Sequence, residues 1–319
     1  MQMQSNAREV NRPEAAATTG PSPNAKLSMQ PIRSFLFVPG NKPTWIEKSV
    51  AARADALILD LEDSVPPDHK AEARGIVQSR LSSLAAQGQR TWVRINRSPH
   101  LYDFDDILAV VGPHLEGIVV SKPVGPEDID TVSSMLAEAE YRRGVPIGST
   151  RVLPLLETAR SLELAFDIAQ RPRVAALVGA TAKNADVARA LGTIWTPGGR
   201  ETLYLKSRIV MAARAAGKLP IGGLWQQVHD LEGLRQSSQR DRELGMSGEL
   251  VLHPSNVAIV NATYSPTPEQ VAFYKGMIAA LDEAQAAGRA SCVYDGEHID
   301  IAHVKTAREA IALAESFGG

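Results

Sequence analysis

The sequence alternates eight short apolar runs with stretches of helical periodicity from residue 33 to residue 287, and this alternation limits the possible folds most. The runs are nearly continuous rather than alternating, as in strands that are buried on both faces of a parallel sheet. Eight successive strand–helix units favour a TIM (β/α)8 barrel over an open doubly wound sheet. No Gly-x-Gly-x-x-Gly motif follows the first run, which weakens the dinucleotide-binding alternative.

The element boundaries follow from the apolar periods and from the Pro and Gly residues between them. We expect strands at residues 33–39, 56–63, 91–96, 117–122, 152–156, 174–178, 220–224 and 249–253. We expect helices at residues 44–53, 70–86, 128–143, 201–216, 230–244 and 269–287.

The length of 319 residues fits one barrel of about 250 residues with extensions at both ends. Residues 1–30 are rich in Ala, Asn, Pro, Ser and Thr without an apolar period, so we expect a disordered N-terminal tail rather than a targeting signal. Residues 31–289 form the expected barrel. Residues 290–319 add a strand-like piece and a helix that a barrel does not need, and we expect this C-terminal arm to pack on a neighbouring subunit.

Composition excludes several classes of partner. The net charge of −2 gives no electrostatic case for nucleic acid or for a membrane surface. No apolar run approaches the roughly 20 residues that span a bilayer. The single Cys292 excludes an internal disulfide and suits a reducing cytoplasm, which is the location we expect.

Charged and polar residues gather where the expected strands end. In a barrel the active-site residues come from the C-terminal ends of strands. This rule selects Asp60, Glu62, Asp63, Arg94, Asn96, Lys122, Glu157 and His253. We call this end of the barrel its mouth. Acidic and basic groups together at the mouth suit a metal ion and an anionic substrate.

We hypothesise that Glu157 and Asp186 hold Mg²⁺, with Mn²⁺ as the alternative ion. Mg²⁺ prefers oxygen ligands, keeps several waters and often takes only one or two protein carboxylates. Arg94 supplies a forked donor for a substrate carboxylate or carbonyl oxygen.

Structural interpretations of the same residues stay open. A strand-end acid such as Glu157 is also common as a helix cap or as a salt-bridge partner. The acids at 60, 62 and 63 could bond loop amides, and Lys122 with Pro123 could be a strand stop. His253 fits a structural role better than a catalytic one, with its ring bonded to a backbone carbonyl.

Six motifs carry a resemblance to a known family: RSFLFVPG at 33–40, LDLED at 59–63, VRIN at 93–96, LETA at 156–159, HPS at 253–255 and GEHID at 296–300. The sequence resembles the citrate lyase β-subunit family, the acyl-CoA lyase group related to the HpcH/HpaI aldolases, from residue 33 to the C-terminus. The resemblance implies a TIM barrel that forms homotrimers or dimers of trimers, binds Mg²⁺, and cleaves or condenses CoA thioesters such as citryl-, malyl- or citramalyl-CoA.

The resemblance also implies roles at the matching positions. Glu157 is implied as a metal ligand and Arg94 as the group that binds substrate oxygens. Asp300 matches an acid/base that reaches a neighbouring subunit's site in malyl-CoA-lyase-like relatives. Two further sets are implied to contact substrate: Glu62 and Asp63 near the metal, and Arg33, Lys42 and Lys70 at the CoA phosphates.

The segment after the sixth strand departs from the family pattern. Most members carry Gly-Ala-Glu-Asp-Leu there, with the Asp on the metal, whereas this chain reads GATAKNADVAR from Gly179. Counting back from the Leu-Gly pair at 191–192 matches Asp186 to the metal-binding Asp, with extra residues before it and no Glu beside it. Either a further helical turn presents Asp186 to the site, or Asp186 lies outside and Thr181 or Asn184 lines the site.

The expected activity is that of a Mg²⁺-dependent lyase acting on a hydroxyacyl-CoA thioester. The metal and Arg94 would stabilise an enolate, and Asp300 would return a proton to it. The alternatives are a thioester hydrolase on the same scaffold, a CoA-independent class II pyruvate aldolase that takes a small carboxylic acid, and a non-catalytic binding subunit. The altered segment keeps the last of these open, but a scaffold needs none of Arg94, Glu157 and Asp300.

Overall fold

The computed structural model describes residues 29–318, and its centre is a closed barrel of eight parallel strands, as the sequence predicted. The strands follow one another around the barrel in chain order, and β8 pairs with β1 to close it. They are β1 (Ser34–Pro39), β2 (Ala56–Asp60), β3 (Arg90–Arg94), β4 (Gly117–Ser121), β5 (Arg151–Leu155), β6 (Ala176–Val178), β7 (Leu219–Gly222) and β8 (Gly248–Val251).

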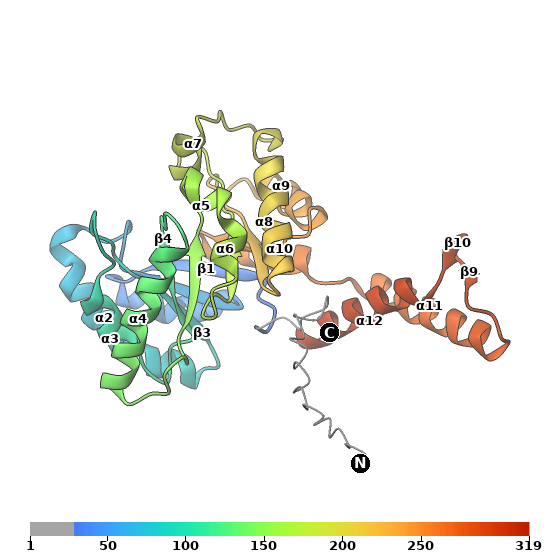
Figure 1. The fold of residues 1–319 in the computed structure, drawn as a ribbon, viewed down its shortest axis with the longest axis horizontal. Helices are drawn as coiled ribbons and strands as arrows, with labels where there is room; N and C mark the ends of the chain where they lie inside the picture. The colour runs from blue at the N-terminus through green and yellow to red at the C-terminus, as the bar shows by residue number, and fades with distance from the viewer. Residues whose placement is uncertain (1–28, 319) are drawn as a thin grey trace, which may run out of the picture.

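Helices surround the barrel on its outside (Figure 1). They are α1 (Pro43–Ser49), α2 (Lys70–Ala86), α3 (Phe104–Val110), α4 (Pro126–Arg143), α5 (Ala159–Glu163), α6 (Ala165–Ala169), α7 (Asp186–Leu191), α8 (Leu203–Ala215), α9 (Leu231–Glu243) and α10 (Val257–Tyr264). Single 3₁₀ turns are η1 (Val50–Ala52), η2 (Pro67–His69), η3 (Arg200–Thr202) and η4 (Pro254–Asn256). The expected helices at 44–53, 70–86, 128–143, 201–216 and 230–244 are confirmed within a few residues.

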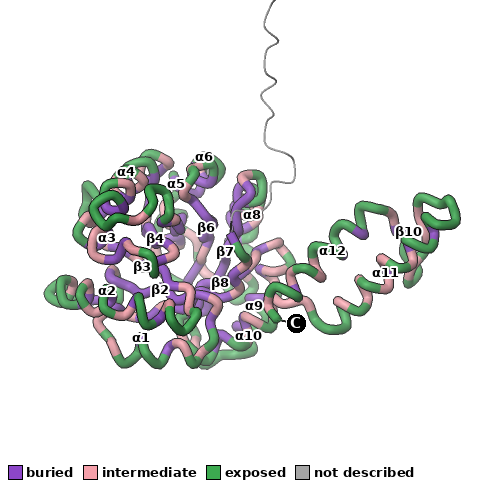
Figure 2. The backbone as a smooth tube through the Cα atoms, turned by 90° about the horizontal axis from the view of Figure 1, so that it is seen from below, coloured by how far each residue is buried: buried purple, intermediate pink, exposed green. Residues whose placement is uncertain are grey.

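The core has two layers, because side chains of a strand point alternately into the barrel and toward the helices. The strands are the most buried part of the chain, as the purple tube in Figure 2 shows. Inside the barrel, Trp92 is fully buried and lies edge-on to Phe35, with ring centroids 6.2 Å apart. Leu57 and Leu59 of β2 belong to the outer layer instead. The barrel interior is therefore filled rather than hollow, and the strand ends leave space for ligands at its mouth.

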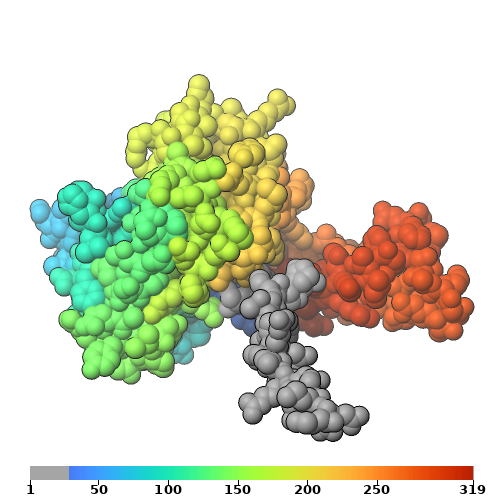
Figure 3. Space-filling view, viewed as in Figure 1, coloured from blue at the N-terminus to red at the C-terminus, as the bar shows by residue number. Residues whose placement is uncertain are grey.

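The C-terminal arm begins earlier than expected. It contains α11 (Pro268–Ala286), β9 (Cys292–Tyr294), β10 (Glu297–Ile299) and α12 (Ile301–Ser316), and it projects from the barrel (Figures 1 and 3). We expected residues 269–287 to be the last barrel helix and the arm to start at 290, and this boundary is wrong. The short α10 covers β8, and α11 packs on α12 around a small core of its own: Met277, Leu281, Ile299, Val304 and Ala307.

The arm is a helical hairpin that returns to the barrel. The ring of Phe317, just after α12, lies 3.9 Å from the guanidinium carbon of Arg33, which directly precedes β1. Asp300 caps the start of α12, beside the β9–β10 hairpin at the far end. At about 1.5 Å per residue, α11 alone is roughly 28 Å long, so Asp300 lies far from the mouth of its own barrel.

Most of the predicted tail of residues 1–30 lies outside the described residues. Met29 lies inside them and is 96% buried, within the same apolar cluster as Phe35 and Trp92. Within residues 29–318, no helix combines the length and the apolar character needed to cross a bilayer.

Gly117 at the start of β4 provides a test of the packing inside the barrel. A Cβ at this position would lie 2.3 Å from the ring of Trp92 and 2.6 Å from the carbonyl oxygen of Arg151. We expect Gly117→Ala to lower the free energy of unfolding by about 1–3 kcal/mol or more, because neither neighbour can move freely. Denaturant unfolding measures this, and Gly112→Ala, where a Cβ meets no atom within 4 Å, is the matched control. Equal destabilisation of the two variants would contradict the packing described.

Candidate active site

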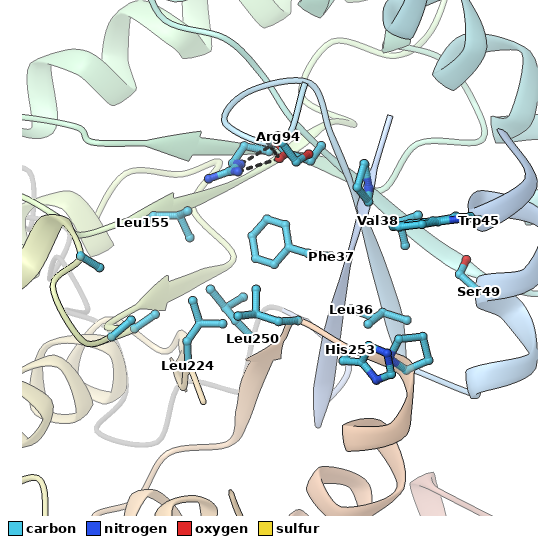
Figure 4. A pocket seen from close by; sticks show the side chains of 18 of the residues that line it. Leu36, Phe37, Val38, Trp45, Ser49, Arg94, Leu155, Leu224, Leu250 and His253 are labelled. Carbon is cyan, nitrogen blue, oxygen red and sulfur yellow. Dashed lines mark hydrogen bonds and ion pairs between the residues drawn. The ribbon is translucent and has the colours of Figure 1, made fainter. Parts of the chain in front are cut away.

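A cavity of about 560 Å³ opens at the C-terminal ends of the strands. Its wall is largely apolar, and Phe37 lies between Arg94 and Leu250 in the close view of Figure 4. The polar residues that line it are Lys48, Ser49, Asp60, Ser64, Arg94, Glu157, Asp186 and His253. The structure thus brings together both predicted metal ligands and the predicted substrate-binding arginine.

Asp60 and Arg94 form a two-pronged ion pair. They are register partners at the ends of β2 and β3, with Nε to Oδ1 at 2.6 Å and Nη2 to Oδ2 at 2.7 Å. Asp60 also accepts the backbone N–H groups of Glu62 and Ser64, so it fixes the loop after β2. Burial acts to raise the pKa of Asp60, but the hydrogen bonds and charge of Arg94 outweigh it and lower that pKa overall. Asp60 is therefore a carboxylate that orients Arg94.

Lys122 connects the two acidic sides of the mouth. Its Nζ lies 2.9 Å from Glu62 Oε1, 3.3 Å from Asp63 Oδ2 and 3.9 Å from Asp186 Oδ2. Glu62 also pairs with Arg94 Nη1 at 3.0 Å. Burial would lower the pKa of Lys122, but its bond to Glu62 and the surrounding carboxylates raise it overall. The residue is more than a strand stop, and its place directly after β4 is the sequence signal that points to it.

Glu157 follows β5 at the start of the next helix. Thr158 caps α5 through a capping box with Ser161, and its hydroxyl donates to the carbonyl of Pro123 at 3.1 Å, which fixes the chain beside Glu157. One carboxylate oxygen of Glu157 is buried and has no hydrogen-bond partner within residues 29–318. Burial raises the pKa of Glu157 to about 7, assisted by the nearby charge of Asp186. An unpartnered buried carboxylate is costly unless a cation reaches it.

Asp186 is the first residue of α7 and lines the same cavity as Glu157. The extra residues before it form a turn, with Asn184 at a φ of 57°, rather than the further helical turn we considered. Asp186 is an ion-pair partner of Arg189 as well as of Lys122. Thr181 lines a different cavity, and Asn184 is exposed. The predicted position of Asp186 at the mouth is thus correct, whereas the alternative that Thr181 or Asn184 lines this cavity is wrong.

The mouth combines carboxylates with cationic side chains. The carboxylates of Asp60, Glu62, Asp63, Glu157 and Asp186 face the cationic groups of Lys70, Arg94 and Lys122. Lys48 also lines the cavity and Arg189 pairs with Asp186, so the ionised acidic and basic groups of the mouth balance. No cluster of three or more His, Cys, Asp or Glu side chains suited to a metal occurs in the described part of the chain. Two carboxylates completed by waters suit Mg²⁺ rather than an ion that needs a full protein cage.

Three predicted contacts to CoA phosphates have different outcomes. Arg33 lies at the opposite end of the barrel, because it precedes β1, and it pairs there with Asp55 at 2.7 Å. It does not belong to this mouth. Lys70 donates to the backbone carbonyls of Leu61 and Glu62 at 2.7 and 2.6 Å, so its ammonium holds the β2 loop. Lys42 is exposed directly before α1, on the mouth side, and stays a candidate.

Three other predicted residues lie in different parts of the structure. His253 lines the cavity, and its Nδ1 bonds the hydroxyl of Ser255 at 2.7 Å rather than a backbone carbonyl. Asn96 donates to Asp106 at 2.7 Å. Asp300 is exposed at the tip of the arm, where it accepts from the backbone of Ala302 and pairs with His303. A hydrogen bond with His303 lowers the pKa of Asp300, so it is ionised near neutral pH.

A closed (β/α)8 barrel whose mouth combines carboxylates with a fixed arginine defines a TIM-barrel protein. The chain belongs to the HpcH/HpaI aldolase/citrate lyase family, whose model matches residues 33–254.

Named relatives align with nearly the whole chain. It is 33% identical to L-malyl-CoA/beta-methylmalyl-CoA lyase of Cereibacter sphaeroides, over 92% of this chain and 97% of that protein. It is 30% identical to (3S)-malyl-CoA thioesterase of the same species, over 90% and 95%. Among solved structures it is similar to a citrate lyase from Burkholderia xenovorans, with a TM-score of 0.77, 21% identity, and 93% and 95% coverage. A structure of CitE from Mycobacterium tuberculosis with magnesium, acetoacetate and coenzyme A gives a TM-score of 0.70 at 23% identity, over 89% and 98% of the two chains.

The contacts of Lys122 predict a pH-dependent effect on stability. Its ammonium offsets the charges of the surrounding carboxylates, which acid neutralises, and it stays charged up to its own raised pKa. We expect Lys122→Met to lower the free energy of unfolding by on the order of 1 kcal/mol at pH 8 and by clearly less at pH 4. Thermal unfolding at both pH values measures this, with the charge-conserving Lys122→Arg as control. The same loss at both pH values would show that packing, not charge, explains the effect.

Proposed function

We propose that this protein is a Mg²⁺-dependent carbon–carbon lyase that acts on a hydroxyacyl-CoA thioester of the malyl-, citramalyl- or citryl-CoA type. The observation that carries the proposal is the buried Glu157 carboxylate, with one unpartnered oxygen, in a cavity that Asp186 and Arg94 also line. The lyase and thioesterase names of the relatives support a CoA thioester as substrate.

Glu157 and Asp186 would hold the metal, because both line the cavity and Glu157 keeps one buried oxygen without a hydrogen-bond partner in the described chain. Mg²⁺, or Mn²⁺ in its place, would supply Lewis-acid stabilisation of the oxyanion that develops during cleavage.

Arg94 would bind an anionic oxygen of the substrate. Asp60 holds its guanidinium in a fixed direction through two short bonds, whereas the contact of Nη1 with Asp63 is longer, at 3.4 Å. Nη1 also contacts Glu62 at 3.0 Å, so a substrate oxygen would take the place of Asp63, whose side chain is 58% exposed, and leave the Asp60 and Glu62 contacts intact. A donor that is already oriented needs little rearrangement when charge develops on the substrate.

The apolar wall suits the rest of the substrate. Phe37, Leu155, Leu250 and Leu252 line the cavity and exclude water from the polar end. Trp45 at the rim is 58% exposed and would cover the CoA part of the thioester. Lys42, three residues before it, would contact a CoA phosphate.

Asp300 would act in the mouth of a neighbouring copy, as acid/base at the carbon that carries the developing charge. Its carboxylate is exposed at the end of a projecting arm, roughly 28 Å of helix away from its own barrel. We therefore propose a closed homo-oligomer, a trimer or a dimer of trimers, in which each arm completes the next subunit's site.

The two reactions named for the relatives give different products from one substrate. Cleavage of malyl-CoA between its second and third carbons gives glyoxylate and acetyl-CoA, and releases no thiol. Hydrolysis adds water at the thioester and gives malate and free CoA thiol.

We expect glyoxylate and acetyl-CoA as the products with Mg²⁺ present. A keto-acid assay detects the glyoxylate, and a parallel thiol assay detects any free CoA. Glu157→Gln should lower kcat by at least about 100-fold, and Glu163→Gln, an exposed acid on α5, should not. Thiol as the main product would establish the hydrolase, and no product with any of the three thioesters would reject the proposal.

The raised pKa of Glu157 predicts pH-dependent metal binding. A carboxyl with a pKa of about 7 must lose its proton before it can coordinate a cation. Below that pKa, the apparent affinity for Mg²⁺ should therefore fall by about tenfold per pH unit, and it should level off above pH 8. Calorimetric titration of the metal-free protein from pH 5 to pH 8 measures this. An affinity that stays constant over this range would contradict Glu157 as a ligand.

The proposed sharing of sites predicts complementation between two inactive variants. Asp300→Ala and Glu157→Gln should each lose activity, but a mixed oligomer contains sites with an intact Glu157 and an intact Asp300 from different chains. A closed trimer that contains both variants has one such site among its three, so it should have roughly a third of the wild-type activity. Co-expression with two affinity tags isolates the mixed oligomer. No recovery, or full activity of Asp300→Ala alone, would exclude a contribution from the neighbouring arm.

A further inference from the structure

A second cavity, of about 260 Å³, lies beside the mouth and takes no part in the proposed reaction. The chain from Trp195 to Leu203, the beginning of the loop after β7 and the inner side of α9 line it. The long connection between β6 and α8 builds most of one wall. The departure from the family pattern, between Gly179 and Asp186, lies earlier in the same connection.

The floor of this cavity is aromatic and apolar. The rings of Trp195 and Trp225 contact each other, with centroids 5.8 Å apart and planes tilted by 53°, and Leu224 and Leu244 extend the surface. Trp225 is 92% buried, and its indole N–H has no acceptor within residues 29–318. A buried donor without a partner costs about 1–3 kcal/mol, so a ligand that offers an oxygen would be stabilised there.

The charged groups that line the cavity leave one cation available. Five of them bond within the protein: Lys206 with Asp241, Arg240 with the carbonyl of Pro197, Glu201 with Thr196, and Glu243 with Gln239. The guanidinium of Arg200 has no hydrogen bond or ion pair to any residue of the described chain, and Arg200 is exposed at the edge. Three basic and three acidic residues line the cavity, so their charges balance, and the Arg200 guanidinium is the one among them without a partner in the described chain.

We propose that this cavity is a second binding site, for a small carboxylic acid with an aromatic or apolar body. Arg200 and the indole N–H of Trp225 would contact the carboxylate, and the tryptophan rings and leucines would contact the body. The volume lies below the roughly 300–1,000 Å³ of cavities that hold drug-sized ligands, which limits the ligand to about the size of benzoate.

The site is distinct from the mouth but shares a wall with it. Leu224 lines both cavities. The backbone of Thr181 bonds to the carbonyl of Gly223 at 2.7 Å and accepts the N–H of Leu224 at 3.3 Å, which joins the loops after β6 and β7. A ligand in the second cavity would therefore lie against the back of the segment that carries Asp186 into the mouth.

Tryptophan fluorescence tests the proposal, because two of the four tryptophans line the cavity. The full chain with Trp45→Phe, which removes the tryptophan of the mouth, is titrated with benzoate and with the uncharged benzamide. We expect a saturable change with benzoate and binding at least tenfold weaker with benzamide. Arg200→Gln should weaken benzoate at least tenfold, whereas Arg235→Gln, an exposed arginine of α9 that already pairs with Glu232, should not.

Two further variants separate the second cavity from the mouth. Ser237→Phe fills the cavity from α9 and should abolish the benzoate response, whereas Glu157→Gln in the mouth should leave it unchanged. Three results would overturn the proposal. The first is no saturable response up to about 10 mM benzoate, a concentration above the millimolar Kd of weak binding. The others are a response that survives both Arg200→Gln and Ser237→Phe, and a response that is lost in Glu157→Gln.

Discussion

The paired bonds between Arg94 and Asp60 are the contact on which the geometry of the mouth depends. The two residues are register partners on neighbouring strands, so the barrel itself brings them together. Asp60 then fixes the β2 loop through two backbone N–H groups, and Glu62 of that loop reaches Lys122. Replacing a buried ion pair by apolar residues can be neutral, but removing one partner costs about 3–5 kcal/mol. The pair therefore contributes mainly by fixing the positions of Arg94 and the β2 loop, rather than by stabilising the fold.

Glu157 is the counterpart of Asp60 at the same end of the barrel. Both carboxylates are largely buried, but Asp60 has a guanidinium against it and a lowered pKa, whereas Glu157 has an unpartnered oxygen and a raised one. Opposite shifts of two neighbouring acids separate a structural carboxylate from one that is available for function. Stability alone would favour an apolar side chain at residue 157, so a ligand is the physical reason for an acid there.

The sequence was sufficient for the barrel and for most of its mouth, because both follow from periodicity. An apolar run that ends in an acid places that acid at the C-terminal end of a strand, and this located Asp60 and Glu157. The same rule applied to Arg33 would have excluded it, since Arg33 stands before its strand rather than after it. The start of the arm was not predictable, because the apolar period of residues 269–287 shows that a face is buried but not what it packs on. The turn before Asp186 depends on one residue at positive φ, Asn184, which no pattern indicates.

The central claim is that Glu157 and Asp186 together hold one divalent cation. The most direct measurement is anomalous X-ray diffraction from crystals that contain Mn²⁺ in place of Mg²⁺, because it locates the ion without depending on activity. The account predicts one strong anomalous peak at coordination distance from both carboxylates, with water completing the shell. A peak held by the β2 acids Glu62 and Asp63 instead, or no peak beside Glu157 at saturating Mn²⁺, would contradict it.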